Sequence, residues 1–231
     1  TVPTGNFGDI FAGYAAMRMG LPVEKLVIAT NANDILARTL ATGRYETGTV
    51  SATMSPSMDI QVSSNFERLI FEASGRDAGL VRRLMNGLSQ SGSFELPQEV
   101  LATIRATFAA AATGEAATAE TIRRVLGETA YLLDPHTAVG VAVAEAMLGA
   151  TSEPAGGEAS IEATMITLGT AHPAKFPDAV KKASGTEPAL PPAHDGLMER
   201  AERFDRLPAE LAAVEDYIRA RTRAETAGDR S

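Results

Sequence analysis

Cysteine is absent from this sequence of 231 residues. The absence excludes a disulfide, a thiolate nucleophile and a thiolate metal site, and it is compatible with a reducing compartment, so we expect a cytoplasmic protein. Long hydrophobic runs are missing as well. The longest run, Ala138 to Ala144, falls far short of the roughly 20 apolar residues that cross a bilayer, and we therefore expect no membrane association.

Basic residues are outnumbered, with 21 lysines and arginines against 29 aspartates and glutamates and a net charge of −8. A nucleic-acid partner would need a local basic patch to overcome this field. Adjacent basic residues occur only as isolated pairs, so we expect no nucleic-acid partner. The three histidines, His136, His172 and His194, have no i,i+4 pairing and no carboxylates at ligand spacing, which predicts no metal site.

The first residue is Thr1 instead of methionine. The opening VPTGNFG has neither the basic start nor the apolar stretch of a signal peptide. We therefore expect that the true N-terminus lies upstream. Length alone would allow one large domain or two small ones.

Helical and strand patterns alternate near the start of the chain. Ile10 to Met19 has a helical pattern that Pro22 ends, because proline cannot continue the helical hydrogen-bond ladder. Lys25 to Thr30 is short, apolar and β-branched, which predicts a strand, and a second helix follows it, capped by Asn33 or Asp34. This succession indicates an α/β fold.

The rest of the chain changes in character several times. Residues 45–59 have no clear period and form a candidate functional loop, whereas residues 63–131 show helical patterns separated by polar breaks. After a loop at Glu153 to Glu158, IEATMITLGTAH from Ile161 predicts a buried strand running into a turn, and Leu207 to Arg219 predicts an amphipathic helix. These patterns divide the chain into an α/β part (1–62), a helical subdomain (63–131), a return to the α/β part (132–185), and a Pro-rich linker with a C-terminal helix (186–231).

The sequence GNFGD precedes the first predicted helix. A strand end followed by such a loop and a helix start brings several backbone N–H groups together at the positive end of the helix dipole, which suits an anion. Gly5 and Gly8 can adopt positive φ and allow close approach to the main chain, and Asn6 can add a side-chain donor. Asp9 would repel an anion unless its side chain turned back to cap the helix.

The residues after the loop limit the class of anion. They contain no Gly-Lys-Ser/Thr, so a magnesium–nucleotide triphosphate is disfavoured and a single phosphate fits better. A plain turn with a helix cap is the alternative interpretation.

Five motifs occur in the order PTGNFGD, IATNANDIL, DIQVSSNFERLIFE, LDPHTAVG and LGTAHPAKFP. Together they resemble the threonine synthase family, whose members are pyridoxal-phosphate (PLP) enzymes of fold type II, and the chain is similar to the C-terminal half of these enzymes. The resemblance implies a three-layer α/β sheet of the tryptophan synthase beta-like kind with a helical subdomain. It also implies that this chain is an incomplete part of that fold.

The resemblance implies a set of cofactor contacts. In the family the GNFGD loop binds the cofactor phosphate, and a threonine hydroxyl lies at the pyridine nitrogen. Thr170 matches that threonine, and a neutral hydroxyl there would leave the ring nitrogen less protonated than a carboxylate would. A turn residue bonded to its own backbone is the alternative for Thr170. The implied phosphate ligands are Gly5, Asn6, Phe7, Gly8 and Asp9.

The Schiff-base lysine of the family lies upstream of GNFGD in a SFKD-type segment, and this sequence has no such segment. The family motif already contains the lysine found here as Lys175, so we expect that residue to be structural or on the surface. We therefore expect no catalytic residue within the chain and no activity of the chain alone. Its lysines are Lys25, Lys175, Lys181 and Lys182.

The function that the resemblance implies is threonine synthase, a lyase of the last step of threonine biosynthesis. It converts O-phosphohomoserine and water to L-threonine and phosphate by γ-elimination and β-hydration, as a monomer or homodimer. Two alternatives stay open at this point. One is another fold-type II PLP lyase, and the other is a non-catalytic fragment that binds a phosphorylated small molecule.

Several side chains have two interpretations each. Asn65 and Arg68 are three residues apart, so they could together hold a substrate phosphate or carboxylate, or Arg68 could be an exposed arginine on an amphipathic helix. Asp134 suits a helix cap, and His136 in the following turn could meet an anion or be a hydrogen-bonded structural residue. Met58, like Met54, is expected in the core.

Overall fold

The computed structural model describes residues 1–151 and 164–222. The chain forms two compact units, Thr1–Ala189 and Leu190–Ser231. The loop predicted at Glu153 to Glu158 lies outside the described residues, as does the start of the strand predicted from Ile161. The domain boundaries proposed at residues 62, 131 and 185 remain predictions.

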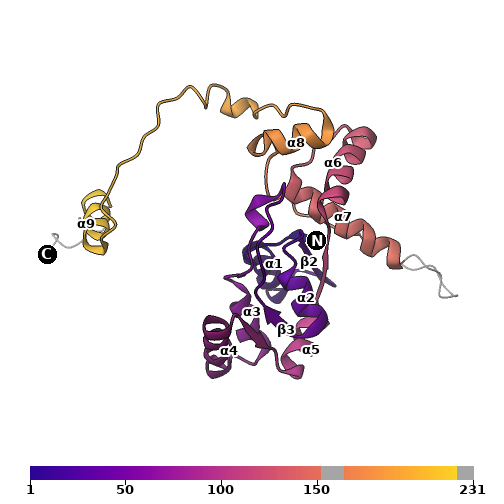
Figure 1. Ribbon diagram of the computed structural model, residues 1–231, viewed down its shortest axis with the longest axis vertical. Helices are drawn as coiled ribbons and strands as arrows, with labels where there is room; N and C mark the ends of the chain where they lie inside the picture. The colour runs from indigo at the N-terminus through magenta and orange to yellow at the C-terminus, as the bar shows by residue number, and fades with distance from the viewer. Residues whose placement is uncertain (152–163, 223–231) are drawn as a thin grey trace. The chain divides into compact units, whose positions relative to one another are not determined.

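The first unit is built on a three-stranded parallel sheet (Figure 1). Its strands are β1 (Val2–Pro3), β2 (Leu26–Thr30) and β5 (Phe108–Ala112), in the spatial order β1-β2-β5. The central strand β2 is buried along its whole length, which explains its uninterrupted run of apolar residues. The strand predicted at Lys25 to Thr30 is confirmed.

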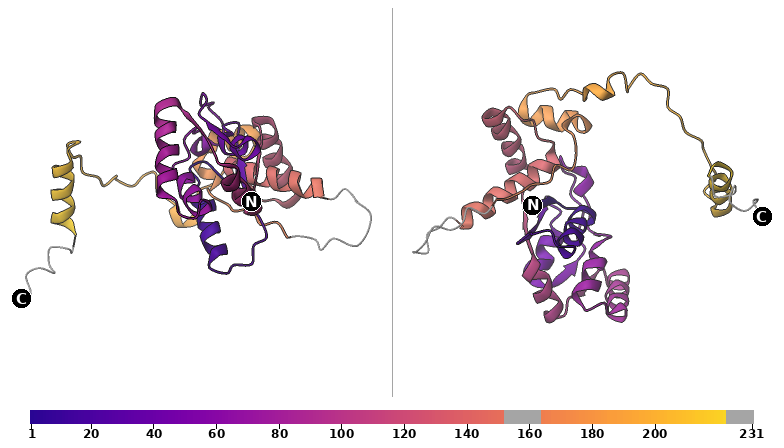
Figure 2. Two further views of the ribbon diagram at one scale, coloured as in Figure 1. Left: turned by 90° about the horizontal axis from the view of Figure 1, so that it is seen from below. Right: turned by 180° about the vertical axis from the view of Figure 1, so that it is seen from behind.

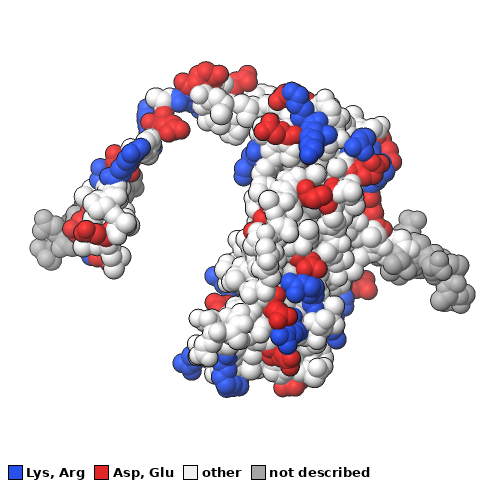
Figure 3. Space-filling view, in the orientation of Figure 1, with Lys and Arg blue, Asp and Glu red and all other residues white. Residues whose placement is uncertain are grey.

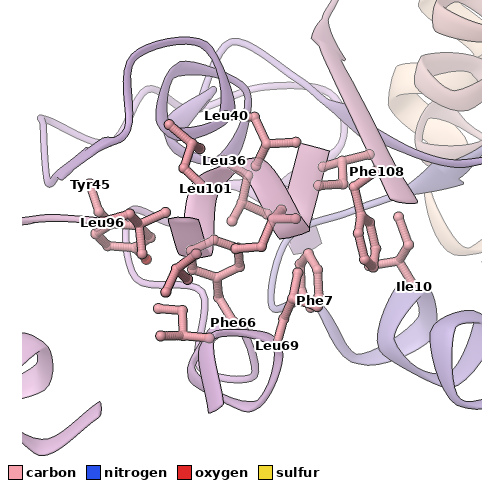
Figure 4. Packing of buried hydrophobic residues seen from close by; sticks show 14 of the residues in the cluster. Phe7, Ile10, Leu36, Leu40, Tyr45, Phe66, Leu69, Leu96, Leu101 and Phe108 are labelled. Atoms are coloured by element: carbon pink, nitrogen blue, oxygen red, sulfur yellow. The ribbon is translucent and has the colours of Figure 1, made fainter. Parts of the chain in front are cut away.

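Helices cover both faces of this sheet. Because side chains alternate along a strand, Leu26 and Ile28 face one layer, whereas Val27 and Ala29 face the other. The first face packs against the larger core (Figure 4), and the second packs against Val139 and Val143 of α7 (Pro135–Thr151). The three-layer arrangement expected from the sequence is therefore present. The helices that contribute to the larger core are α1 (Gly8–Arg18), α2 (Ile35–Thr42), α3 (Phe66–Ala73), α4 (Ala78–Ser91) and α5 (Gln98–Thr107).

Strand β5 corrects the description of residues 63–131 as purely helical. The helices α3, α4, α5 and α6 (Glu115–Thr129) are there, but the alanine-rich Phe108–Ala112 is a strand paired with β2. Alanine favours helices, and pairing with the sheet overrides that preference. A small antiparallel sheet is a further departure, formed by β3 (Arg44–Glu46) and β4 (Ser93–Glu95).

Residues 164–170 correct another expectation. The N–H of Leu168 donates to the carbonyl of Thr1 at 3.0 Å, and the Thr1 amino group donates to the carbonyl of Ile166 at 2.6 Å. This is the hydrogen-bond pattern of a parallel pair, so the segment runs beside β1, although no strand is assigned in it. Its position is the outer edge of the sheet, where Ile166 is 69% exposed, and the prediction of a buried strand is wrong for the described residues.

The remaining elements are short. The first unit also contains η1 (Pro56–Met58), η2 (Pro173–Lys175) and α8 (Pro177–Ser184), and the second contains η3 (Pro192–His194) and α9 (Leu211–Arg221). Helix α9 begins four residues later than the helix predicted from Leu207. Within the described ranges, no helix is both long and apolar enough to cross a membrane.

Acidic and basic side chains are interspersed over the visible face of the first unit (Figure 3). Two further views show α7 leaving the layer of the sheet on the side opposite α3 and α4 (Figure 2). The sheet thus separates the small helices of the larger core from α7.

The close contact of α7 with Pro3 and Thr167 at Gly140 predicts that adding one methyl group there lowers stability. A Cβ added to Gly140 would lie 2.8 Å from Thr167 Cγ2 and 3.1 Å from Pro3 Cγ. We expect Gly140→Ala to lower the free energy of unfolding of the full-length protein by about 1–3 kcal/mol, as overpacking does. Urea denaturation followed by circular dichroism measures it.

The same helix offers a matched control. A Cβ at Gly149 would meet no atom of the described residues within 4 Å, so Gly149→Ala should raise the free energy of unfolding by roughly 0.5–1 kcal/mol. Equal stability of Gly140→Ala and wild type would show that α7 shifts freely on the sheet.

Candidate functional site

The GNFGD loop forms one wall of a cavity of about 160 Å³ at the carboxyl end of β1. The carboxyl ends of the strands in a parallel sheet are the usual place for a ligand in α/β folds. The lining comes from four separate parts of the chain. It consists of Pro3, Thr4, Gly5, Asn6, Phe7, Gly8, Asp9, Ile10, Ser57, Met58, His136, Thr170, Ala171 and Lys175.

Phe7 has the unusual backbone of the loop. Its φ of 69° and ψ of 9° place it in the left-handed region, which costs a residue with a side chain about 1–3 kcal/mol. Its ring is fully buried, with its centroid 5.3 Å from that of Phe66 and 5.8 Å from that of Phe108 (Figure 4). The packed ring holds the backbone in this conformation.

Gly5 and Gly8 were expected to adopt positive φ, and neither does. A Cβ on Gly5 would lie 3.0 Å from the carbonyl oxygen of Ser57 and 3.2 Å from Met58 Cα. A Cβ on Gly8 would lie 3.1 Å from Asn6 Oδ1. Gly5 therefore lets the loop pass close to the backbone of Ser57 and Met58, whereas a Cβ on Gly8 would require a small shift of the Asn6 side chain. The left-handed turn falls on Phe7.

The loop presents free backbone donors to the cavity. The N–H of Gly8 is taken by Asn6 Oδ1 at 2.9 Å, which closes a tight turn. Among the described residues, no hydrogen-bond partner exists for the N–H groups of Asn6, Phe7, Asp9 and Ile10. The last two belong to the first turn of α1, where the helix dipole adds positive potential. This donor set fits a phosphate or a similar oxyanion.

Asp9 contributes a carboxylate at the rim of the cavity. Its side chain does not turn back to cap α1, the condition under which repulsion of an anion would be avoided, since Asp9 makes no side-chain hydrogen bond within the described part of the chain. The titratable residues that line the cavity are Asp9, His136 and Lys175. Lys175 was expected only to be structural or on the surface; it is exposed, yet it lines this cavity beside Thr170.

Thr170 reaches the loop because of the sheet register. Residues 166 and 168 both bond to Thr1 in the parallel pattern described above. Residues 164–170 and β1 therefore leave the sheet at the same carboxyl end. Two residues after Leu168, Thr170 stands level with the start of the GNFGD loop and lines the cavity. The Thr170 hydroxyl makes no hydrogen bond to its own backbone in the described ranges.

A buried polar pair supports the cavity from behind. Asp134 Oδ1 accepts hydrogen bonds from the His136 N–H at 2.8 Å and from His136 Nδ1 at 3.1 Å, which confirms Asp134 as the cap of α7. His136 Nε2 accepts the N–H of Ser57 at 3.2 Å, so the imidazole proton lies on Nδ1. His136 is thus both a hydrogen-bonded structural residue and part of the cavity wall.

Burial opposes the ionisation of Asp134, but hydrogen bonds from the side chains and N–H groups of His136 and Thr137 outweigh it. The pKa of Asp134 is therefore held below its ordinary value. The carboxylate stays ionised at neutral pH and keeps the imidazole oriented toward Ser57.

Asn65 and Arg68 do not meet at one cavity. Asn65 Nδ2 donates to the carbonyl of Asn6 at 2.9 Å, whereas Arg68 lies over the ring of Phe11 and lines a separate, open cavity of about 510 Å³. Their joint contact with a substrate anion remains a prediction. Met58 is buried and Met54 packs against the core, as expected.

Comparison with known proteins gives one consistent result. Residues 137–218 match the family model described as threonine synthase, C-terminal. The chain is 47% identical to the threonine synthase of Pseudomonas aeruginosa over 94% of its own length and 45% of that protein. It is 41% identical to the threonine synthase of Saccharomyces cerevisiae over 93% of its own length and 43% of that protein.

Solved structures agree with the sequence relatives. A PLP-bound threonine synthase from Brucella melitensis is 57% identical, with a TM-score of 0.82 over 97% of this chain and 46% of that one. The yeast threonine synthase has a TM-score of 0.78 at 36% identity, over 94% of this chain and 46% of its own. The sheet and its two helical layers thus define a part of a fold-type II α/β fold.

Within that class, the chain is similar to the C-terminal part of threonine synthases. It spans a little under half the length of the relatives it matches, between 43% and 46% in these comparisons. These comparisons confirm the resemblance to the C-terminal half of threonine synthases that the motifs indicated.

The Asp134 cap predicts a pH-dependent loss of stability. Asp134→Asn removes one acceptor oxygen from a buried cluster, so we expect the free energy of unfolding at pH 7 to fall by about 1–2 kcal/mol. Because the pKa of Asp134 is lowered on folding, its contribution is complete above the ordinary aspartate pKa and is lost as pH falls through the folded value. The gap between wild type and variant should therefore narrow below about pH 4.

Urea denaturation of the full-length protein at several pH values measures this gap. Asp77 is the matched control, because it caps α4 at an exposed position through the N–H of Leu80, and asparagine caps as well as aspartate. Asp77→Asn should change stability by only a few tenths of a kcal/mol. A gap for Asp134→Asn that stays constant down to pH 3 would contradict the role of the ionised carboxylate.

Proposed function

We propose that this chain is the part of a threonine synthase that binds the PLP phosphate and contacts the pyridine ring. The whole enzyme would convert O-phosphohomoserine and water to L-threonine and phosphate, as a PLP-dependent lyase. One observation carries the proposal: Thr170, far along the sequence, lines the same small cavity as the GNFGD loop. The 57% identity to a PLP-bound threonine synthase supports it.

The proposed contacts follow from the donors that the fold leaves free. The N–H groups of Asn6, Phe7, Asp9 and Ile10 bind the phosphate, and Gly5 and Gly8 keep the main chain accessible. The Thr170 hydroxyl lies at the pyridine nitrogen. When bound, PLP withdraws electrons from the carbon that the elimination requires, and a neutral hydroxyl moderates this withdrawal.

Charge at the cavity favours an anionic ligand in a limited way. Lys175 lines the cavity and adds a positive charge, which offsets the repulsion between the Asp9 carboxylate and a phosphate. Both side chains are exposed, so water and salt weaken each effect. The dominant attraction is therefore assigned to the backbone donors and the dipole of α1.

We place the lysine that bonds covalently to PLP outside residues 1–231. The engagements of the four lysines support this. Lys25 Nζ donates to the carbonyls of Arg105 and Ala106 at 2.9 and 3.0 Å, and Lys181 pairs with Glu187 at 2.7 Å. Lys182 is exposed on α8, and Lys175 lies at the cavity proposed for the phosphate. We further propose a cytoplasmic enzyme, monomeric or homodimeric.

The experiment uses the full-length protein with PLP and O-phosphohomoserine. Threonine and phosphate are quantified, and after borohydride reduction the pyridoxyl-modified peptide is identified by mass spectrometry. We expect equimolar threonine and phosphate, with the adduct on a lysine outside residues 1–231.

An adduct at Lys175 would overturn the placement of the lysine. Turnover to other products would indicate another fold-type II lyase. Phosphate binding with neither adduct nor turnover would indicate a non-catalytic module that binds a phosphorylated small molecule.

Thr170 supplies a test of the ring contact. Thr170→Val removes the hydroxyl at nearly constant shape, so PLP should bind within about threefold of wild type, because its phosphate contacts are unchanged. The visible absorption band should shift, and kcat should fall about tenfold, which corresponds to roughly 1.4 kcal/mol. Titration, spectroscopy and steady-state kinetics provide the three readouts.

Thr170→Ser is the matched control, because it keeps the hydroxyl and loses only a methyl group. It should retain the wild-type spectrum. A valine variant with both wild-type spectrum and wild-type kcat would reduce Thr170 to a turn residue.

A further inference from the structure

Two consecutive carbonyls of the GNFGD loop are held by side chains from another part of the chain. The carbonyl of Gly5 accepts a hydrogen bond from Ser63 Oγ at 2.8 Å. The carbonyl of Asn6 accepts two, from the N–H of Asn65 at 3.0 Å and from Asn65 Nδ2 at 2.9 Å. Ser63 and Asn65 precede α3 and do not line the cavity.

These bonds determine where the N–H groups of the loop point. In a trans peptide unit the carbonyl and the following N–H point in opposite directions. Fixing the carbonyl of Gly5 therefore fixes the N–H of Asn6, and fixing the carbonyl of Asn6 fixes the N–H of Phe7. Both N–H groups are among the donors that have no partner in the described part of the chain.

The two clamping residues are themselves anchored. The N–H of Ser63 donates to the Tyr45 hydroxyl at 2.8 Å, and the buried Tyr45 ring stacks on Phe94 at 4.7 Å. Burial raises the pKa of Tyr45, an effect that the Ser63 N–H only partly opposes, so the phenol stays neutral. Phe66, the residue after Asn65, packs against Phe7. The clamp is thus tied to the same core that holds the loop.

We propose that Ser63 and Asn65 are positioning residues for the phosphate of the ligand. They hold the carbonyls of Gly5 and Asn6 away from the cavity, so that the N–H groups of Asn6 and Phe7 face the phosphate before it binds. The inference rests on the proposed function in taking PLP as that ligand. It gives Asn65 a role exerted through the loop, distinct from direct contact with a substrate.

The test compares Ser63→Ala and Asn65→Ala with wild type in the full-length protein. Equilibrium titrations give the dissociation constants for PLP, for pyridoxal, which lacks the phosphate, and for inorganic phosphate. Each variant should bind PLP and inorganic phosphate about 3- to 10-fold more weakly, as the loss of one hydrogen bond implies. Pyridoxal affinity should change less than about twofold, since the ring contacts are untouched.

Two features keep the test sharp. Asn65 is only partly buried, so Asn65→Ala preserves the fold even if Ser63→Ala, at a buried position, does not. Ser74→Ala is the matched control, because the Ser74 hydroxyl donates to the carbonyl of Phe71 at the far end of α3 and does not touch the loop. It should leave all three affinities unchanged.

Equal weakening of PLP and pyridoxal would overturn the proposal, because it would indicate a general structural role. Unchanged PLP and phosphate affinities in Asn65→Ala would overturn it as well. Inorganic phosphate separates this inference from the proposed function. A wild type that binds phosphate but not PLP, with phosphate binding weakened in the variants, would reject PLP as the ligand and retain the clamp.

Discussion

The buried ring of Phe7 is the contact on which the rest of the site depends. Its backbone adopts a left-handed conformation that costs about 1–3 kcal/mol, and burial of a phenylalanine side chain contributes about 1.5–3 kcal/mol. The conformation can therefore persist without a ligand. Because the ring packs between Phe66 of α3 and Phe108 of β5, the core sets the direction in which the loop turns. The conformation of the GNFGD loop is therefore a consequence of core packing and does not rely on the conformational freedom of glycine.

The second constraint is the parallel pairing of β1 with residues 164–170, which brings segments distant in sequence together at the carboxyl end of β1. Residues 164–170 and β1 run side by side, so Thr170 and the loop emerge together. On the face of the sheet that carries Val27 and Ala29, α7 approaches Pro3 and Thr167 closely because Gly140 has no side chain. The N-terminus of α7 then brings Asp134 and His136 to the back of the cavity, where His136 holds Ser57. Helical layers on both faces of the sheet thus contribute to one small site.

The sequence was informative where the determining interactions are local. The strand at Leu26–Thr30, the helix α1 that begins within GNFGD and the Asp134 cap follow from composition and spacing within a few residues. Strand β5 could not be inferred this way, because its alanines form a strand only when β2 is beside them. Likewise, the left-handed Phe7 depends on rings that lie far away in sequence, whereas glycine in such a loop is the local choice for positive φ. The motif resemblance brought Thr170 to the site, which spacing alone could not do.

The irregular segment 45–59 shows how the remaining polar groups are disposed. Asn31, at the end of β2, donates to Asp59 Oδ1 at 2.8 Å, and the N–H of Thr53 donates to Asp59 Oδ2 at the same distance. Within the described ranges, every buried side-chain nitrogen and oxygen has a hydrogen-bond partner. The free donors of the GNFGD loop are backbone N–H groups, and on the inference above those of Asn6 and Phe7 point toward the ligand before it binds. Such preorganisation lowers the cost of binding, and it favours a compact oxyanion over a ligand that would need side chains to rearrange.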